Sequence, residues 1–558
     1  MADHVDPYRI YLDHARSQPL AAALADFYTN VDEAEEVAAE LDNLFLPFRT
    51  RTMAGRRHFA PSSAWRDELA MLPPGEMPTP QRFVVRVHLF EDSGGQAGRY
   101  LGFVSLRPPR AAKFQKRRSR QAHRLFRYVI DAELAAPGYM QRPRYHVLTT
   151  TASSGRLGVL PFRSAVYSTP SLRDKGAACT HLAVSQALHL IMGRFGCRPI
   201  SQEEFRWHLW RHTKRMQGQT IGEVSDNGAN LWDALKVIRN SCNGGGFLRS
   251  VWPEENQDTL SDRERRLVYR HLTDCLACGL PVIAIVKAGR LLTHEIQQDL
   301  IRAGKGAQLN IPHAVLILGM HLLHSQEELP HQSANGSMRV DHAELPGRLI
   351  VHDTVHRGPF FEWMMSDFID AAIEAYPGAD RGVHMLTVGP HQMNLGAHRA
   401  RSATEDVLDG ILMNLALMGG QDTSGNSDLD ALNSYLRSTD VQTSAAEDAS
   451  QWSIVCRLLS SVEICQRYEG RSNMLVRHGD FDHLPTSFAW VVEVRHPQAM
   501  AANARPLPAT PDDLPPALVH VWDATKEPEN PIDRSHGITP EMILVYQSEP
   551  PHHHGRPS

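Results

Sequence analysis

Cys179 is the residue whose surroundings most clearly suggest chemistry. It lies in the segment 175–190, in which Gly176 precedes a run of apolar residues at helical spacing. The sequence therefore predicts that the thiol sits at or near the start of a helix. There the unpaired backbone N–H groups and the helix dipole favour the thiolate, the form that attacks carbonyl carbon.

Two further residues of suitable type follow Cys179, each at the end of a predicted strand. His313 begins the apolar run His-Ala-Val-Leu-Ile-Leu-Gly319, and Asp353 ends the run Arg-Leu-Ile-Val-His-Asp353. A cysteine, a histidine and an aspartate in this order supply a nucleophile, a general base and an orienting carboxylate. The pattern predicts covalent acyl transfer, in which His313 takes the proton of Cys179 and Asp353 fixes the imidazole ring.

This arrangement of Cys179, His313 and Asp353 resembles the papain-like cysteine peptidases, and most closely a bacterial branch that includes the double-glycine leader peptidases. The resemblance rests on the cysteine helix, the His-Ala-Val strand and the His-Asp strand end, and it covers about residues 156–392. It implies a core with a helical half that carries Cys179 and a twisted antiparallel sheet that carries His313 and Asp353. It also implies a peptide or protein substrate, without a metal or other cofactor.

The oxyanion position departs from the family pattern. The family usually places a glutamine about six residues before the cysteine, where its amide supports the oxyanion, and this chain has Arg173 there. An arginine side chain can also donate hydrogen bonds to an oxyanion. Arg173 is therefore the candidate oxyanion residue, beside the backbone N–H of Cys179.

The expected function is that of a cysteine-dependent peptidase or isopeptidase that acts through an acyl-enzyme. Two alternatives stay open. A transglutaminase-type acyltransferase shares the Cys/His/Asp chemistry but passes the acyl group to an amine. A non-catalytic binding module would keep the papain-like scaffold and carry a thiol of ordinary reactivity.

The 558 residues are enough for several domains. Polar, turn-rich stretches predict an α+β protein in three parts: an N-terminal α+β domain at 1–155, the papain-like core at 156–392, and a C-terminal α+β domain at 393–558 with a disordered tail. Helical periodicity predicts helices at 20–27 and 31–46, and alternation at 82–90 and 100–106 predicts a hairpin.

Further elements are expected in the core and in the C-terminal part. A helix is expected from about 261 to 278, closed by Gly279, and the apolar run 281–286 is expected to form a buried strand. Strands are also predicted at 488–494 and 517–522.

Bulk composition argues against several classes of partner. The formal net charge of −5 predicts no nucleic-acid partner, and we interpret the basic run at 110–127 as a solvated face. No apolar run approaches the roughly 20 residues of a membrane span, and the polar N-terminus is not that of a signal peptide. The seven cysteines, sparse and odd in number, predict free thiols and a cytoplasmic location. The oligomeric state stays open.

Other potential sites have simpler interpretations. The pair Cys275 and Cys278 lacks a second pair at zinc-site spacing, so we expect these thiols to pack in the core. His208 and His212 lie one helical turn apart but lack the glutamate that a zinc peptidase needs. His181 lies two residues after Cys179 and points to another face of the predicted helix, so we interpret it as structural.

Overall fold

The structure is a computed structural model that combines helices with antiparallel sheets, so the chain is an α+β protein. Its described residues divide into two compact units. The first draws them from 1–265, 279–322 and 346–390, and the second from 266–278 and 391–558. The described residues are 18–19, 52–60, 84–92, 97–106, 129–141, 145–148, 153–157, 160–164, 167–168, 178–198, 200, 202–214, 218, 229–254, 257–321, 347–353, 358–418, 453–469, 474–479, 481, 484, 488–495, 516–525 and 542–546.

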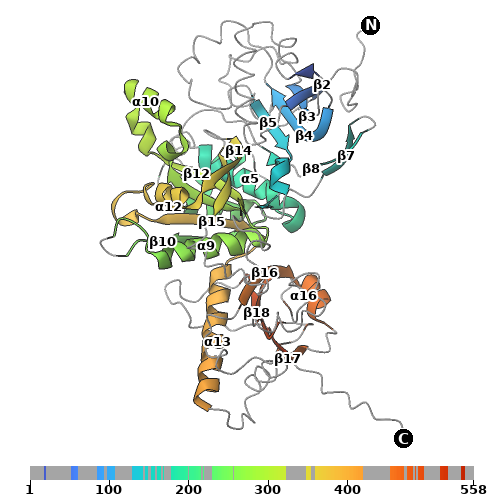
Figure 1. Ribbon diagram of the computed structural model, residues 1–558, viewed down its shortest axis with the longest axis vertical. Coiled ribbons are helices and arrows are strands. Elements are labelled where there is room, and N and C mark those ends of the chain that lie inside the picture. The colour runs from blue at the N-terminus through green and yellow to red at the C-terminus, as the bar shows by residue number, and fades with distance from the viewer. Residues whose placement is uncertain are drawn as a thin grey trace. The chain divides into compact units, whose positions relative to one another are not determined.

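An antiparallel sheet with the strand order β1-β2-β3-β4-β5-β9 begins the first unit (Figure 1). The predicted hairpin is present as β3 and β4. The strands are β1 (Gln18–Pro19), β2 (Thr52–Ala60), β3 (Val84–Asp92), β4 (Ala97–Leu106), β5 (Val129–Leu134) and β9 (Tyr167–Ser168), and a separate pair is β7 (Ser153–Leu157) with β8 (Leu160–Ser164). The predicted helices at 20–27 and 31–46, the basic run at 110–127, and Arg173 lie outside the described residues.

The central sheet of the first unit has the strand order β10-β15-β11-β12-β13-β14, and the short β6 pairs with the end of β12. All of these neighbours are antiparallel. The strands are β6 (Tyr145–Val147), β10 (Gly245–Val251), β11 (Val282–Lys287), β12 (Pro312–His321), β13 (Arg348–Asp353), β14 (Gly358–Met364) and β15 (Val383–Gly389). This sheet carries the predicted base and the predicted orienting carboxylate.

The two innermost strands, β11 and β12, owe their place to continuous apolar runs. The side chains of 282–286 and 314–318 are all apolar and buried, as expected for strands that are covered on both faces. Gly319 follows in β12, where β6 approaches closely. A Cβ at this position would lie 2.3 Å from the carbonyl oxygen of His146. Glycine is therefore required for β6 to pair with β12.

Helices α5 and α12 cover the central sheet, and several helices of the chain begin or end at residues of the expected type. The helix α5 packs against β11, β12 and β15, while α12 packs against β11, β14 and β15. Asn230 caps α8 by accepting from the backbone N–H of Asp233, and Ser261 and Glu264 cap α9 reciprocally. Gly279, with a φ of +77°, follows the end of α9 as predicted. These elements are η5 (Gly138–Gln141), α5 (Ala178–Phe195), α6 (Gln202–Leu209), the π-helical turn η6 (Trp210–Lys214), α8 (Leu231–Ser241), α9 (Asp262–Ala277), η8 (Ala288–Leu291), α10 (His294–Arg302), η9 (Gly306–Asn310), α12 (Met365–Ile373) and η10 (Gly378–Asp380).

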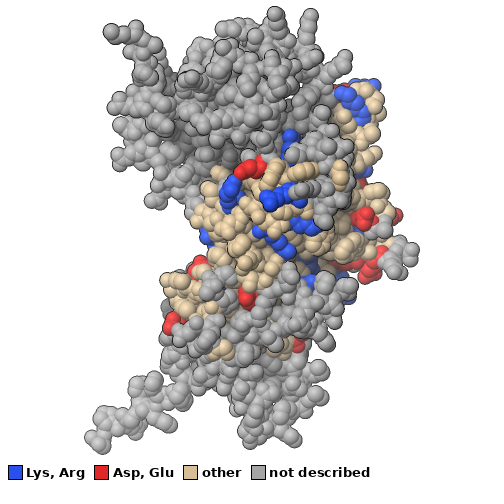
Figure 2. Space-filling view, turned by 180° about the vertical axis from the view of Figure 1, so that it is seen from behind, with Lys and Arg blue, Asp and Glu red and all other residues tan. Residues whose placement is uncertain are grey.

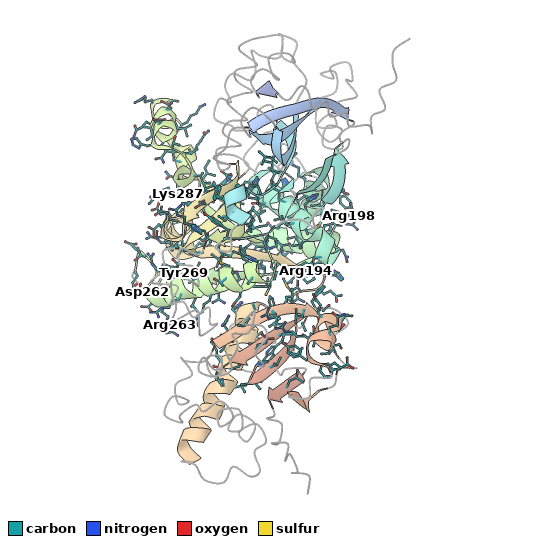
Figure 3. The ribbon with its side chains drawn as sticks, turned by 45° about the vertical axis from the view of Figure 1, so that its right-hand side comes forward. Arg194, Arg198, Asp262, Arg263, Tyr269 and Lys287 are labelled. Carbon is teal, nitrogen blue, oxygen red and sulfur yellow. The ribbon has the colours of Figure 1, made fainter. Side chains whose placement is uncertain are left out.

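Basic side chains mark the C-terminal end of α5, where Arg194 lies in the last turn and Arg198 just beyond it (Figure 3). Positive charge at this end complements the negative end of the helix dipole. Arg198 also pairs with Glu204 of α6. The positive end of the same dipole is the first turn, which contains Cys179.

The second unit has an antiparallel sheet of its own, with the order β16-β18-β19-β20-β17. Ile464 and Tyr468 of α16 pack against Val491, Val519 and Leu544 in a buried apolar cluster. The elements are α13 (Ala397–Met418), β16 (Ser453–Ser460), α16 (Ser461–Tyr468), β17 (Met474–His478), β18 (Phe488–Arg495), β19 (Leu518–Asp523) and β20 (Met542–Tyr546). The two strands predicted near 488–494 and 517–522 are thus present as β18 and β19.

The described surface carries both signs of charge. In Figure 2, Lys and Arg side chains occur beside Asp and Glu among uncharged residues. Within the described part of the chain, no helix is both long enough and apolar enough to cross a bilayer.

Candidate active site

Cys179 is the second residue of α5 and is half-buried in the first helical turn. The N–H groups of a first turn have no partner within the helix, so they and the dipole stabilise negative charge on the sulfur. The hydroxyl of Thr180 donates to the carbonyl oxygen of Ala229 at 2.9 Å. This bond ties the first turn of α5 to the residue in front of the cap of α8 and so holds the candidate nucleophile in place.

His313 and Asp353 lie at adjoining ends of two paired strands. His313 is the second residue of β12 and Asp353 the last of β13, and the antiparallel register of these strands brings the two ends together. His313 Nε2 lies 2.8 Å from Asp353 Oδ1. His313 is 6% exposed and Asp353 is fully buried, so water competes little for this bond. The contact leaves Nδ1 of His313 as the ring nitrogen that can face Cys179.

Cys179 and His313 interact, and each shifts the pKa of the other. Burial alone would raise the pKa of the Cys179 thiol, but the charge of His313 and hydrogen bonds with its side chain and the backbone of Ala314 lower it below its ordinary value. Burial likewise works against protonated His313, yet Asp353 and Cys179 raise its pKa to about 10. Both shifts favour a thiolate–imidazolium pair.

Cys197 and Cys242 show what burial does to a thiol when desolvation dominates its pKa. Burial raises the pKa of Cys197 and of Cys242 to about 12. Cys465 is the other half-buried thiol of the chain, while the remaining five are buried. Partial exposure is therefore shared by Cys179 and Cys465, but the histidine partner with its buried carboxylate belongs to Cys179.

One candidate oxyanion donor lies at the start of α5. The backbone N–H of Cys179 lies at the start of a helix, where such groups can stabilise an oxyanion. Arg173, the expected second donor, is among the residues that the structure does not describe. It remains a prediction from the sequence.

Three residues near the triad were not assigned a role from the sequence. Gln186 of α5 and His352 of β13 are buried, and their Nε2 atoms lie 2.9 Å apart. Burial raises the pKa of Tyr376, and the charge of Cys179 adds to this effect, so the phenol lies within electrostatic reach of the sulfur. Gln186 follows Cys179 by seven residues, close to two helical turns, and this spacing could have identified it. No sequence pattern marks Tyr376.

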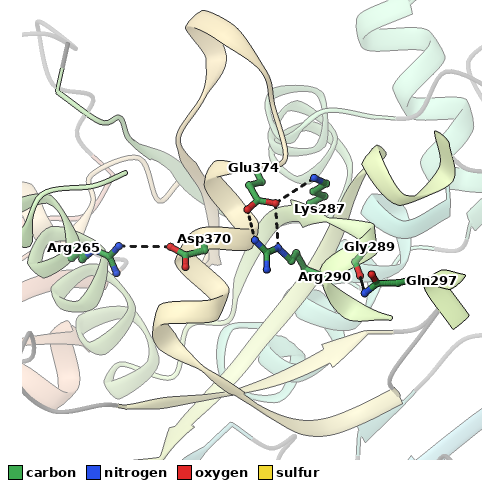
Figure 4. A network of polar contacts seen from close by, with 7 residues as sticks. All are labelled: Arg265, Lys287, Gly289, Arg290, Gln297, Asp370 and Glu374. Carbon is green, nitrogen blue, oxygen red and sulfur yellow. Dashed lines mark hydrogen bonds and ion pairs between the residues drawn. The ribbon is translucent and has the colours of Figure 1, made fainter. Parts of the chain in front are cut away.

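A network of charged side chains holds the segment that leads from β11 toward β12 (Figure 4). Glu374, just after α12, accepts from Lys287 Nζ at 3.3 Å and from Arg290 Nε at 3.2 Å. Gln297 Nε2 donates to the carbonyl oxygen of Gly289 at 2.9 Å. Such partly exposed ion pairs contribute about 1 kcal/mol or less each. Their main effect is to fix the segment that precedes the histidine strand.

The CxxC pair packs in the second unit. Cys275 Sγ lies 3.9 Å from Nδ1 of His271, and the thiol of Cys278 donates to the carbonyl oxygen of Cys456 at 3.4 Å. In the described ranges, no group of three or more His, Cys, Asp or Glu side chains is placed to hold a metal ion.

The other histidines singled out from the sequence pack against aromatic neighbours. The ring of His181 lies 4.5 Å from that of Phe205. The rings of His208 and His212 are stacked 5.8 Å apart. These ring contacts indicate that the three histidines have a packing role.

Comparisons with protein-family models, curated proteins and solved structures find no match to this chain.

Proposed function

We propose that the chain is a cysteine-dependent hydrolase of peptide or isopeptide bonds, built on a papain-like core at about 156–392. The observation that supports this most strongly is the polar chain from Cys179 through His313 to the buried Asp353. It joins one helix start to two strand ends that are distant in the sequence. The lowered pKa of the thiol and the raised pKa of the imidazole are what covalent catalysis by a cysteine requires.

In the first half of the reaction, the Cys179 thiolate attacks the carbonyl carbon and a C–S bond forms while the carbonyl π pair moves to oxygen. The N–H of Cys179 donates to the resulting oxyanion, with Arg173 as the proposed second donor. The tetrahedral intermediate collapses as the C–N bond breaks. Imidazolium His313 gives its proton to the leaving amine, and the acyl group stays on the sulfur as a thioester.

In the second half, neutral His313 takes a proton from water as the water oxygen attacks the thioester carbon. Collapse of this second intermediate breaks the C–S bond, releases a carboxylic acid and restores the thiolate–imidazolium pair. Asp353 accepts from Nε2 of His313 throughout and keeps Nδ1 directed at the reacting atoms. No metal or cofactor takes part in this scheme.

The remaining parts of the proposal concern the surroundings of the core. The flanking regions 1–155 and 393–558 would select the peptide or protein substrate. The seven cysteines form no disulfide bond with one another, which supports a reducing compartment such as the cytoplasm.

The test is to label the folded protein with iodoacetamide at pH 6 to 7 and to map the adducts by mass spectrometry. We expect Cys179 to react first and Cys465, which is also half-buried, to react at the rate of an ordinary thiol. Cys465 is thus the internal control for partial exposure. Faster reaction of Cys465, Cys275 or Cys278 would contradict the assignment of the site.

The same site could serve the two alternatives, and the products separate them. An acyltransferase would form product only when an amine acceptor is added, whereas a hydrolase would release acid without one. A binding module would show Cys179 reacting no faster than Cys465.

A further inference from the structure

A second buried polar contact joins the helix and the strand that carry the triad. Gln186 lies on nearly the same face of α5 as Cys179, because seven residues are close to two helical turns. His352 immediately precedes Asp353 in β13. The side chains of Gln186 and His352 are 2% and 1% exposed, and their Nε2 atoms lie 2.9 Å apart. The contact therefore connects the cysteine helix to the aspartate strand inside the core.

The chemistry of this contact fixes the protonation of His352. An amide nitrogen can only donate, so Nε2 of His352 must accept and its ring proton must be on Nδ1. A protonated ring would set an N–H group against the N–H group of Gln186. With the amide nitrogen placed toward the ring, as it is in the structure, His352 is in its neutral form.

The neutral state of His352 affects the triad because two histidines lie close to Asp353. One is His313, which bonds the carboxylate at 2.8 Å, and the other is His352, the preceding residue in the chain. A second imidazolium beside Asp353 would compete with His313 for the negative charge. The two rings have opposite shifts: burial lowers the pKa of His352 to about 3 against the pull of Asp353, while the pKa of His313 is raised.

We infer that Gln186 and His352 are positioning residues of the triad. Their hydrogen bond sets the placement of α5 on β13, and it keeps His352 uncharged so that Asp353 acts on His313 alone. This inference rests on the proposed function of Cys179.

The test compares four variants of the full-length chain. Gln186→Leu removes the donor, and His352→Leu removes the acceptor. His352→Gln offers an amide oxygen as a substitute acceptor. The matched control is Ser185→Ala, since the Ser185 hydroxyl on the same helix donates to the carbonyl oxygen of Ile200 at 3.0 Å. The readout is the rate of Cys179 alkylation by iodoacetamide between pH 5 and pH 9, with circular dichroism to confirm folding.

We expect Gln186→Leu and His352→Leu to slow alkylation at pH 6 by about tenfold and to move the thiolate limb of the pH profile upward by about one unit. His352→Gln should keep most of the rate, and Ser185→Ala should match the wild type. Where a Leu variant does not fold, the comparison of His352→Gln with the wild type decides, and a loss of about tenfold there would count against the inference.

Two results would overturn the inference in distinguishable ways. If wild-type Cys179 is hyper-reactive and Gln186→Leu loses no more than Ser185→Ala, the positioning role is wrong and the proposed function stands. If wild-type Cys179 reacts no faster than Cys465, the proposed function fails and the positioning role fails with it.

Discussion

Asp353→Asn tests the charge that distinguishes the proposed base from other histidines of the core. The pKa of His313 is raised from 6.5 to about 10, despite burial. One pKa unit corresponds to about 1.4 kcal/mol, so the net stabilisation of the imidazolium, after the burial penalty, is on the order of 5 kcal/mol. Asp353 contributes both charge and a hydrogen bond, and a hydrogen bond to a charged group contributes about 2–3 kcal/mol.

Asparagine keeps the shape of the side chain and removes its charge. The proton shared between Cys179 and His313 should then return to the sulfur, because imidazolium is no longer stabilised by Asp353. We expect alkylation of Cys179 at pH 6 to fall by about 30- to 150-fold, the factor that corresponds to 2–3 kcal/mol. The loss should shrink as the pH rises, since the thiol then ionises without help from His313.

The assay is a series of iodoacetamide rate constants from pH 5 to pH 9, measured by mass spectrometry of the Cys179 peptide. Asp299→Asn is the control, because Asp299 lies on α10 with 63% of its side chain exposed. An unchanged pH profile in Asp353→Asn would refute the claim that this carboxylate holds His313 protonated. A uniform loss at every pH would indicate misfolding of the site instead of a lost charge.

Three further predictions address other residues. Cys179→Ala and His313→Ala should each abolish release of acid from a peptide library, and the double variant should lose no more than either, since triad members act as a unit; additive losses would argue against a shared mechanism. Arg173→Ala should reduce turnover by about 10²–10³ while Cys179 labelling is kept, and Arg173→Gln should recover part of it; unchanged turnover would exclude Arg173 as a donor. Burial, helped by the charge of Arg206, lowers the pKa of His181 to about 3. Between pH 6.5 and pH 3, His181 is therefore protonated in the unfolded chain but neutral in the folded one. The free energy of unfolding should fall by about 2 kcal/mol at pH 5 for this reason. His181→Leu should make urea unfolding less sensitive to acid over this interval, and the exposed His294→Leu should not.

The sequence predicts the central helices and strands well because the patterns that define them involve residues close together in the chain. The apolar run at 281–286 becomes β11, which begins and ends one residue later, and the helix expected from about 261 to 278 is α9 at Asp262–Ala277. Helix caps at Asn230 and Ser261 and the left-handed Gly279 also depend only on nearby residues. The structure also brings Cys179, His313 and Asp353 together, because each stands at an element end that the pattern marks.

The sequence does not predict elements that depend on distant partners. β10 begins Gly-Gly-Phe, a poor strand pattern, and exists through its pairing with β15. A Cβ at Gly246 would lie 2.3 Å from the carbonyl oxygen of Thr387, so glycine is needed where the two strands meet. The contact of Gln186 with His352 is of the same kind, because it joins positions 166 residues apart.

Three buried histidines show why residue type and spacing cannot identify the base by themselves. His181, His352 and His313 are all below a tenth exposed, and burial works against the charged form of each. The pKa of the first two falls to about 3, while that of His313 rises to about 10, because Asp353 bonds its ring and Cys179 lies beside it. Burial thus keeps a histidine uncharged unless a carboxylate bonds directly to its ring. In the proposed mechanism, the position of Asp353 at the end of the neighbouring strand therefore selects His313 as the base, and Cys179 acts as a nucleophile only as its partner.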